Sequence, residues 1–256
     1  MENKIFQNQV AIITGAGKGI GFAVARELAL RGAKVVLNDI DSALAESASK
    51  RISEEAGFCE AFGGDVSDIN IIEGIVAFAV EKFGKLDILL ANAGITTYGD
   101  FLEYQPASMQ RLLQINLFGT FFLTQAATKQ MVKQGQGGSI LITSSVTGHA
   151  AHPFLAAYGM TKAGLDQLVK NLVIDLGPHK ININTMVPGA TLTERTLIED
   201  PDYLEIWSRI TPSGRPSTTD DIVNAALFLV SPASRQIMGQ NLVIDGGWTS
   251  VGVPPY

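Results

Sequence analysis

The sequence predicts an α/β fold: a doubly wound parallel sheet of seven strands with helices on both faces. Short β-branched runs alternate with longer segments of helical periodicity along the chain, which is the order of repeated β-α-β units. The strand candidates are almost continuously apolar, as in strands that helices cover on both faces. There is no internal repeat and no linker rich in Pro, Gly or Ser, so we expect one domain over residues 1–256.

The expected strands are short runs of Val, Ile and Leu bounded by turn-forming residues, a pattern typical of buried strands. In chain order they are 10–14, 34–39, 59–66, 86–91, 138–144, 181–187 and 241–245.

Two of the intervening segments carry clear helix signals. Segment 21–32, GFAVARELALRG, has apolar residues every three to four positions and a glycine stop. Segment 67–84 begins with Ser67 and Asp68 as candidate caps and ends at Gly84. Each therefore predicts a helix that packs on the sheet.

One region breaks the alternation. Residues 189–218, GATLTERTLIEDPDYLEIWSRITPSGRPST, follow the sixth strand without a simple period. A long insertion at the carboxyl edge of such a sheet is where substrates are usually covered. We expect a substrate lid there.

Composition excludes several classes of protein. The net charge is −6 and no run of Lys or Arg occurs, which argues against nucleic acid or a membrane surface as partner. Cys59 is the only cysteine, so no internal disulfide or multi-thiolate metal site is expected. A strand begins within ten residues of the start and no apolar stretch has bilayer-spanning length, so the expected location is the cytoplasm.

The stretch TGAGKGIG, residues 14–21, predicts a phosphate-binding turn. Its glycines let the backbone approach a pyrophosphate, and the following helix would direct free N–H groups at the anion. The spacing G-x-x-x-G-x-G of Gly15, Gly19 and Gly21, with Gly17 inside, differs from the usual G-x-G-x-x-G. Taken alone, the cluster is equally compatible with a turn that only needs glycine for its geometry.

Asp39 ends the second expected strand, twenty-four residues after Gly15. An acidic residue there typically accepts hydrogen bonds from the adenosine ribose and repels a 2′-phosphate, which favours NAD over NADP. Lys18 favours the opposite choice, because it could pair with that phosphate. Asp41 is a rival for the ribose contact, and Asp39 could instead be a solvated turn residue.

The residues in order along the chain resemble the short-chain dehydrogenase/reductase family, in its single-domain oxidoreductase branch, and the resemblance implies a Rossmann-like fold. It rests on TGAGKGIG, Asp65-Val66, Asn92-Ala93-Gly94, Asn116, Ser145, the YGMTK segment with Tyr158 and Lys162, Pro188-Gly189 and Asp245-Gly246-Gly247. Thr191 stands where the family more often has a branched apolar residue. The cofactor-binding residues predicted in this way are Gly15, Gly17, Lys18, Gly19, Ile20, Gly21, Asp39, Ile40, Asp65, Val66, Asn92, Ala93, Gly94, Tyr158, Lys162, Pro188, Gly189, Thr191 and Thr193.

Ser145, Tyr158 and Lys162 predict the proton chemistry. Residues four apart on a helix share a face, so the Lys162 ammonium can lie beside the Tyr158 phenol. A free phenol has a pKa of about 10, and a nearby cation favours its ionised form. Ser145 would bind the same substrate oxygen, and the resemblance implies that Asn116 holds a water linking Lys162 to solvent. The alternative is a partly buried core tyrosine with a snorkelling lysine.

The substrate is less well indicated. His152, with Thr96, Thr97 and Glu194, would make the mouth of the site polar and suited to a sugar or polyol. Alternatively, these polar side chains are solvated loop residues. A further alternative is an apolar pocket for an acyl chain or steroid-like ring, lined by Phe154, Leu155, Leu197, Trp207 and Ile210. His149 and His152 have no evident third ligand, so no metal is expected.

The predicted function is hydride transfer between a nicotinamide cofactor and a secondary alcohol or ketone. NAD is favoured over NADP as the cofactor. The expected substrate is a sugar, a polyol or a similar hydroxylated compound. The alternatives are a 3-oxoacyl thioester (acyl carrier protein) reductase and, in another class, a non-catalytic dinucleotide-binding sensor or structural subunit. The resemblance also implies a homotetramer, and the apolar C-terminal segment 248–256 is a candidate contact with a neighbouring subunit.

Overall fold

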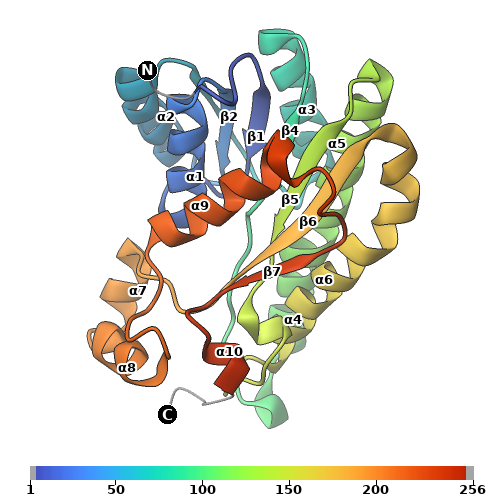
Figure 1. Ribbon diagram of the computed structural model, residues 1–256. Coiled ribbons are helices and arrows are strands. Elements are labelled where there is room, and N and C mark those ends of the chain that lie inside the picture. The colour runs from blue at the N-terminus through green and yellow to red at the C-terminus, as the bar shows by residue number, and fades with distance from the viewer. Residues whose placement is uncertain (1–3, 252–256) are drawn as a thin grey trace.

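The computed structural model describes residues 4–251, so the last five residues of the C-terminal segment lie outside the described part. It forms a seven-stranded parallel sheet in the order β3-β2-β1-β4-β5-β6-β7 (Figure 1). The order reverses between β1 and β4, which is where doubly wound sheets open a crevice. The strands are β1 (Val10–Ile13), β2 (Lys34–Asp39), β3 (Cys59–Gly63), β4 (Ile88–Ala91), β5 (Gly138–Thr143), β6 (Ile181–Pro188) and β7 (Asn241–Ile244).

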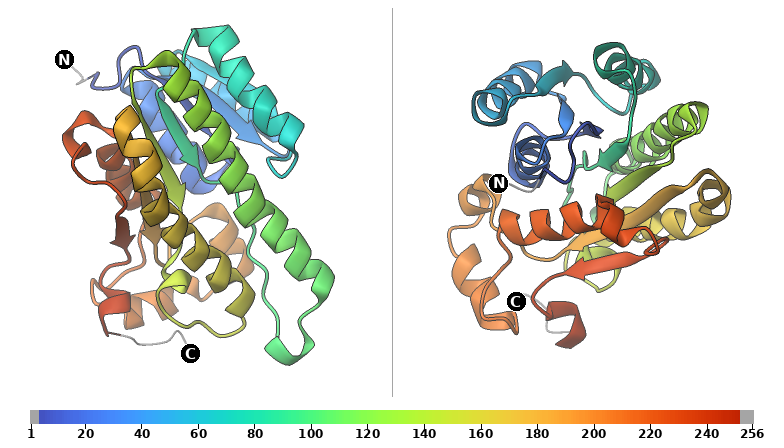
Figure 2. Two further views of the ribbon diagram at one scale, coloured as in Figure 1. Left: turned by 90° about the vertical axis from the view of Figure 1, so that its right-hand side faces the viewer. Right: turned by 45° about the horizontal axis from the view of Figure 1, so that its top comes forward.

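Helices cover both faces, as expected (Figure 2). One core cluster packs α1, α2 and α9 on the sheet, and a second packs α3, α5 and α6 on the opposite face. The central strands are therefore buried on both sides, which explains their continuous apolar sequence. The helices are α1 (Gly19–Leu30), α2 (Ser42–Ala56), α3 (Ile69–Phe83), α4 (Pro106–Leu113), α5 (Thr120–Gln134), α6 (Ala156–Leu176), α7 (Glu194–Glu199), α8 (Tyr203–Ile210), α9 (Thr219–Val230) and α10 (Trp248–Val251).

Some expected boundaries were wrong by a few residues. The strand expected over 59–66 ends at Gly63, because Gly64 adopts a φ of +146° and turns the chain away. The strand expected from residue 86 begins at Ile88, because the backbone of Leu86 bonds the side chain of Gln134 instead of a neighbouring strand. The helix that follows the glycine turn begins at Gly19 and ends at Leu30, two residues before the expected glycine stop at Gly32.

Of the two candidate caps of α3, Ser67 and Asp68, the structure uses Asp68. Its carboxylate accepts the N–H of Asn70 at 2.9 Å, and the helix ends at Gly84 with a left-handed φ of +84°. Asp41 caps α2 by accepting the N–H of Leu44 at 3.1 Å. These contacts satisfy backbone donors at the helix starts that would otherwise lack partners.

Residues 189–218 contain two short helices, α7 and α8, at the carboxyl edge of the sheet (Figure 1). Trp207 of α8 packs against Trp248 of α10, with ring centroids 5.5 Å apart, in a small third core with Val146 and Val187. The segment is thus anchored to the edge where the strands end. Across residues 4–251 no helix has both the length and the apolar character needed to cross a bilayer.

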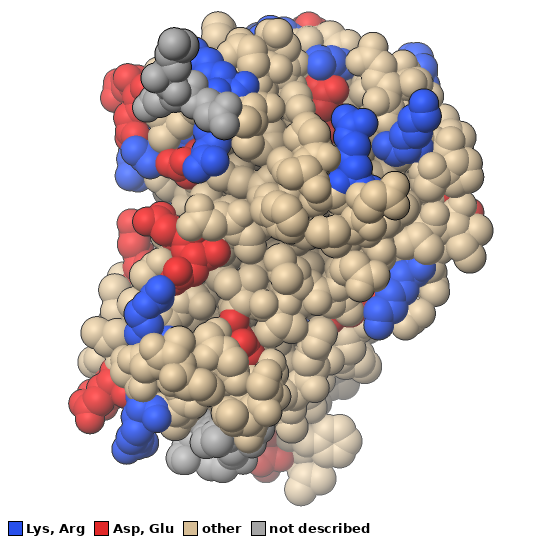
Figure 3. Space-filling view, in the orientation of Figure 1, with Lys and Arg blue, Asp and Glu red and all other residues tan. Residues whose placement is uncertain are grey.

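Charged side chains are dispersed on the face of the molecule shown in Figure 3. Lys and Arg occur singly or in small groups among Asp, Glu and uncharged residues, and no continuous basic patch covers this face.

Candidate active site

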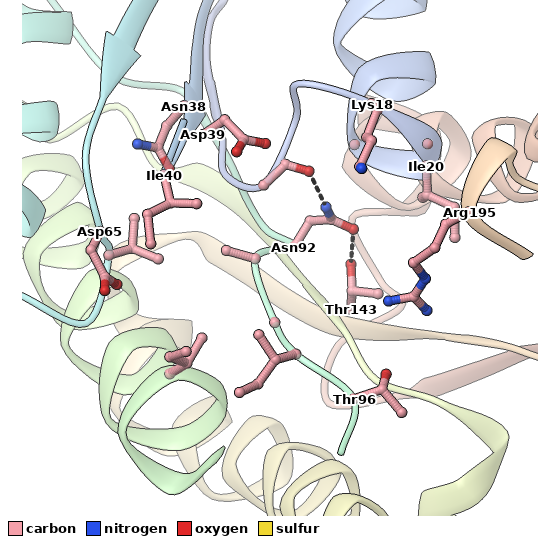
Figure 4. A pocket seen from close by; sticks show the side chains of 18 of the residues that line it. Lys18, Ile20, Asn38, Asp39, Ile40, Asp65, Asn92, Thr96, Thr143 and Arg195 are labelled. Carbon is pink, nitrogen blue, oxygen red and sulfur yellow. Dashed lines mark hydrogen bonds between the residues drawn. The ribbon is translucent and has the colours of Figure 1, made fainter. Parts of the chain in front are cut away.

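A cleft of about 390 Å³ opens at the carboxyl edge of the sheet, where the strand order reverses (Figure 4). Most of the predicted cofactor residues line it, together with several that the sequence did not indicate. The predicted residues in its wall are Gly15, Lys18, Gly19, Ile20, Gly21, Asp39, Ile40, Asp65, Val66, Asn92, Ala93, Gly94, Tyr158, Lys162 and Thr193.

The glycine turn needs its glycines for two different reasons. Gly15 and Gly19 adopt left-handed φ values of +59° and +63°, which favour glycine. Gly21 is required by close packing, because a Cβ there would lie 2.5 Å from the carbonyl oxygen of Gly15. A Cβ on Gly17 would lie 2.6 Å from the side chain of Leu44, so this glycine lets the turn approach α2.

Asp39 is fastened beside this turn. Its carboxylate accepts the N–H of Gly17 at 3.0 Å and that of Asp41 at 3.2 Å. The rival Asp41 is occupied in capping α2. Of these two aspartates, Asp39 is therefore the one presented to the cleft, next to Ile40 (Figure 4).

Asp65 and Val66 line the far end of the cleft with Arg111, which the sequence did not single out. Burial alone would raise the pKa of Asp65, but hydrogen bonds from Arg111 at 2.8 Å and from the Ser67 N–H at 2.9 Å hold it below its ordinary value. The carboxylate stays ionised and fixed. Together with the exposed side chain of Ile40, this end offers both apolar and polar contacts.

Asn92 joins three strands at the base of the cleft. Its amide nitrogen donates to the carbonyl oxygens of Thr14 and Gly15, each at 3.0 Å, and its Oδ1 accepts the Thr143 hydroxyl at 3.0 Å. Thr143 ends β5, and Thr14, the first residue of the TGAGKGIG turn, follows β1 directly. Asn92 thus fixes the glycine turn relative to β4 and β5.

Tyr158 and Lys162 share one face of α6, as their spacing predicts. Lys162 is 4% exposed, its ammonium donates to the Thr143 carbonyl at 2.8 Å, and its Nζ lies 5.5 Å from the centre of the Tyr158 ring. Burying an ammonium without such a partner is unfavourable. The cation is therefore placed beside a half-buried phenol inside the cleft.

Ser145 and Asn116 do not line the cleft themselves, although Thr143, two residues before Ser145, and Ile95, which Asn116 bonds, both line it. Ser145 follows β5, and its hydroxyl accepts from the backbone N–H and hydroxyl of Thr147 at 3.3 and 3.0 Å. Asn116 is fully buried in a π-helical turn, Gln114–Gly119, where its side chain bonds both the N–H and the carbonyl of Ile95 at 2.9 Å. π-turns inside helices often occur at functional sites.

The segment after β6 closes the cleft from the side. Thr193 caps α7, and its methyl group would lie 3.9 Å from a Cβ on Gly19. Arg195 also lines the cleft, on the same side as Lys18 and Ile20 in the view of Figure 4. Pro188, Gly189 and Thr191 do not line the cleft, but they shape this segment.

Their contacts are with the protein itself. A Cβ on Gly189 would lie 2.6 Å from that of Asp245, and the Thr191 N–H donates to the Tyr203 hydroxyl at 3.1 Å. Burial raises the pKa of Tyr203 to about 12, so this anchor stays neutral.

Other chemically active side chains lie outside the cleft. His152 bonds the carbonyl of its neighbour Pro153 at 2.9 Å and does not line the cleft, and His149 pairs with Asp166. Burial raises the pKa of the Cys59 thiol to about 12, which makes it a poor nucleophile. Within residues 4–251 no group of three or more His, Cys, Asp or Glu could hold a metal ion.

Comparison with known proteins gives consistent matches over nearly the whole chain. A family profile described as Enoyl-(Acyl carrier protein) reductase matches residues 15–249. L-rhamnose 1-dehydrogenase (NAD(P)(+)) of Sphingomonas sp. (strain SKA58) is 36% identical over 247 residues, covering 95% of this chain and 97% of that protein.

Solved structures also match nearly the whole chain. A short-chain type dehydrogenase/reductase from Mycobacterium marinum superposes with a TM-score of 0.90 at 32% identity, covering 96% of this chain and 98% of that chain. A 7α-hydroxysteroid dehydrogenase solved with NADH and 7-oxo glycochenodeoxycholic acid superposes with a TM-score of 0.90 at 36% identity, covering 96% of each chain.

Proposed function

The chain belongs to the short-chain dehydrogenase/reductase family and is an NAD(P)-dependent oxidoreductase acting on CH–OH groups; from that premise we propose that Tyr158 exchanges the proton of the reacting hydroxyl. The observation that carries the proposal is the buried Lys162 ammonium, 5.5 Å from the centre of the Tyr158 ring inside the cleft.

The residues of the cleft fit a dinucleotide. The glycine turn and the start of α1 would hold the pyrophosphate, Asp39 the adenosine ribose, and Lys162 the nicotinamide ribose. When bound, the nicotinamide ring donates or accepts the hydride. Arg195 and Lys18 add two cations to the wall where phosphates would lie.

The protein's own part is proton transfer and orientation. We assign to the Tyr158 phenol the exchange of a proton with the substrate oxygen, with the Lys162 ammonium placed beside its ring. Ser145, at the end of β5, would donate a hydrogen bond to that oxygen. Asn116 fixes the backbone of Ile95 close to Lys162, since a Cβ on Gly94 would contact both side chains, at 3.2 and 3.6 Å. A water held there would connect Lys162 to solvent.

NAD is the proposed physiological cofactor. Asp39 is ordered by the Gly17 N–H at 3.0 Å, so a carboxylate stands where the 2′-phosphate of NADP would need room and positive charge. Lys18 lines the same cleft but belongs to the turn, and we assign it to the pyrophosphate.

For the substrate we propose a sugar, polyol or similar hydroxylated compound. Thr96 and Glu194 add polar side chains to the cleft wall that holds Tyr158, and one relative bears the name of an L-rhamnose dehydrogenase. A 3-oxoacyl thioester reductase remains the second candidate, favoured by the exposed apolar side chains of Leu197 and Ile198 in the lid segment 189–218 and of Phe154. A homotetramer in the cytoplasm is part of the same proposal.

The test is cofactor-linked turnover. Purified protein is assayed with L-rhamnose, other sugars, polyols, hydroxy acids and 3-hydroxyacyl thioesters, with NAD and NADP in parallel. We expect turnover of a hydroxylated substrate, with kcat/KM higher for NAD, and a loss of at least roughly a hundredfold in kcat for Tyr158→Phe, the range of general acid–base catalysis.

The control is binding rather than turnover. Tyr158→Phe should still bind NADH in a fluorescence titration, because the phenol oxygen is the only atom removed. Full activity in this variant would refute the assigned role of Tyr158. Tight NADH binding without turnover of any compound by the unaltered protein would favour the sensor or structural alternative.

A further inference from the structure

A buried cluster that the proposed reaction does not use joins the turn after Ser145 to helix α6. Nε2 of His149 lies 2.9 Å from Oδ2 of Asp166, whose side chain is 7% exposed. The other carboxylate oxygen accepts the hydroxyl of Thr185, on β6, at 2.9 Å. Both oxygens of a nearly buried carboxylate are therefore bonded, one to the turn and one to the sheet.

The turn and the helix are in close contact around this cluster. A Cβ on Gly148 would lie 2.8 Å from the backbone nitrogen of Ala163, and one on Gly159 would lie 2.5 Å from the carbonyl oxygen of Thr147. The hydroxyl of Ser144 donates to the Lys162 carbonyl at 3.2 Å. With glycines on both sides, the contact depends on directional bonds rather than on interlocking side chains.

The positions of the bonded residues link the two halves of the proposed catalytic group. Asp166 lies one helical turn beyond Lys162 and two beyond Tyr158, on the same face of α6. His149 closes the single 3₁₀ turn that Ser145 opens. The His149–Asp166 bond therefore sets the separation between the segment that carries the serine and the helix that carries the tyrosine.

We propose that His149 and Asp166 are positioning residues, which hold the Ser145 hydroxyl in register with the Tyr158 phenol. The inference rests on the proposed function of those two groups. A bond to a carboxylate fixed by a second donor is stronger and more directional than a neutral contact. Breaking it frees the turn to move, and displacements of an ångström are costly in a proton-transfer geometry.

The test compares His149→Ala with His149→Gln, whose amide can replace the imidazole N–H as donor to Asp166. The assay uses the compound that the unaltered protein turns over fastest, beginning with L-rhamnose. We expect His149→Ala to lower kcat by roughly 10–100-fold while the KM for the cofactor changes by less than about twofold, because orientation and not binding is lost. His149→Gln should restore kcat to within about threefold of the unaltered protein, by the same orientation argument.

The matched control is His179→Ala, which removes an exposed histidine beyond the far end of α6. It should leave kcat unchanged. Hydrogen exchange of residues 145–150 gives a second measurement without substrate: the amides of Gly148, His149 and Ala150, bonded to Ser145 and Val146, should exchange faster in His149→Ala and not in His149→Gln.

The outcomes separate this inference from the proposed function. If Tyr158→Phe is inactive while His149→Ala keeps full kcat and slow exchange, the positioning role is wrong. If His149→Ala and His149→Gln lose activity equally, in proportion to a lower melting temperature, the pair only stabilises the fold and the inference is overturned. If Tyr158→Phe is fully active, the proposed function itself fails, and the role of the pair in catalysis fails with it.

Discussion

Gly19 and Gly135 have similar backbone conformations but different surroundings, so comparing them separates the effect of a glycine on stability from its effect on ligand binding. Their φ values are +63° and +69°, and a Cβ would meet no atom closer than 3.9 Å at Gly19 and none within 4 Å at Gly135. Alanine at either position therefore pays the same left-handed backbone strain of roughly 1–2 kcal/mol. Gly19, however, lines the cleft at the start of α1, whereas Gly135 ends α5.

We predict that Gly19→Ala and Gly135→Ala lower the free energy of unfolding by similar amounts, measured by chemical denaturation. Only Gly19→Ala should weaken NADH binding, by roughly tenfold or about 1.4 kcal/mol, because its methyl group occupies the space that a pyrophosphate would approach. Equal NADH affinity in the two variants would contradict the assignment of this turn to the cofactor.

At the scale of single elements, the acidic start of helix α9 gives the clearest dependence of protein stability on pH. Asp221 accepts from Arg215 and from the backbone and hydroxyl of Thr218, the cap of the helix. The hydrogen bond from Arg215, followed by that from Thr218, holds the pKa of Asp221 well below its ordinary value. A lowered pKa means that the contribution to stability is complete above the unfolded-state pKa of about 4 and is lost as the pH falls below it.

We predict that Asp221→Asn lowers the melting temperature at pH 7 and that the difference from the unaltered protein shrinks as the pH falls from about 4, where the unfolded carboxyl protonates. The control is Asp220→Asn, one residue earlier. It removes the same charge from the same helical turn, but this carboxylate makes no hydrogen bond among the described residues. A pH-independent difference for Asp221→Asn would refute the role of its ionised form.

Sequence patterns predicted the elements well because each reflects a local or periodic cause. Continuous apolar runs located all seven strands, and Gly84 and Asp68 marked the ends of one helix. Boundaries failed where a distant partner decided them, as at Leu86, whose backbone bonds Gln134 forty-eight residues away. The two short helices of the lid segment were not predicted, and Trp207 of α8 packs against Trp248, which is distant in sequence.

At the scale of the whole molecule, the site likewise contains residues that sequence spacing could predict and residues that only the folded sheet brings together. Tyr158 and Lys162 are neighbours on one helix, so spacing alone placed them together. Arg111 and Thr143 could not be found in this way, because they meet Asp65 and Asn92 only after the sheet has formed. The role of His152 in substrate binding remains a prediction. In the structure its ring bonds the carbonyl of Pro153, and it does not line the cleft.

Because the cleft is lined by residues of β2 and α6 and by residues that follow β1, β3, β4 and β6, a ligand in it contacts parts of the chain that are far apart in sequence. A ligand that binds only the folded state stabilises it by RT ln(1 + [L]/Kd), or about 2.7 kcal/mol at a hundred times Kd. For a chain of 150–250 residues each kcal/mol raises the melting temperature by about 2–4 °C. NADH at that concentration should therefore raise it by roughly 5–10 °C.

We predict that NADPH at equal concentration raises the melting temperature less than NADH, because the Asp39 carboxylate repels a 2′-phosphate. In Asp39→Ser the two shifts should converge, since serine keeps a small polar side chain beside the Gly17 N–H but removes the charge. Thermal unfolding with each cofactor, in the unaltered protein and in this variant, checks the prediction. A larger shift with NADPH than with NADH in the unaltered protein would mean that Lys18 and Arg195, and not Asp39, decide which cofactor the cleft accepts.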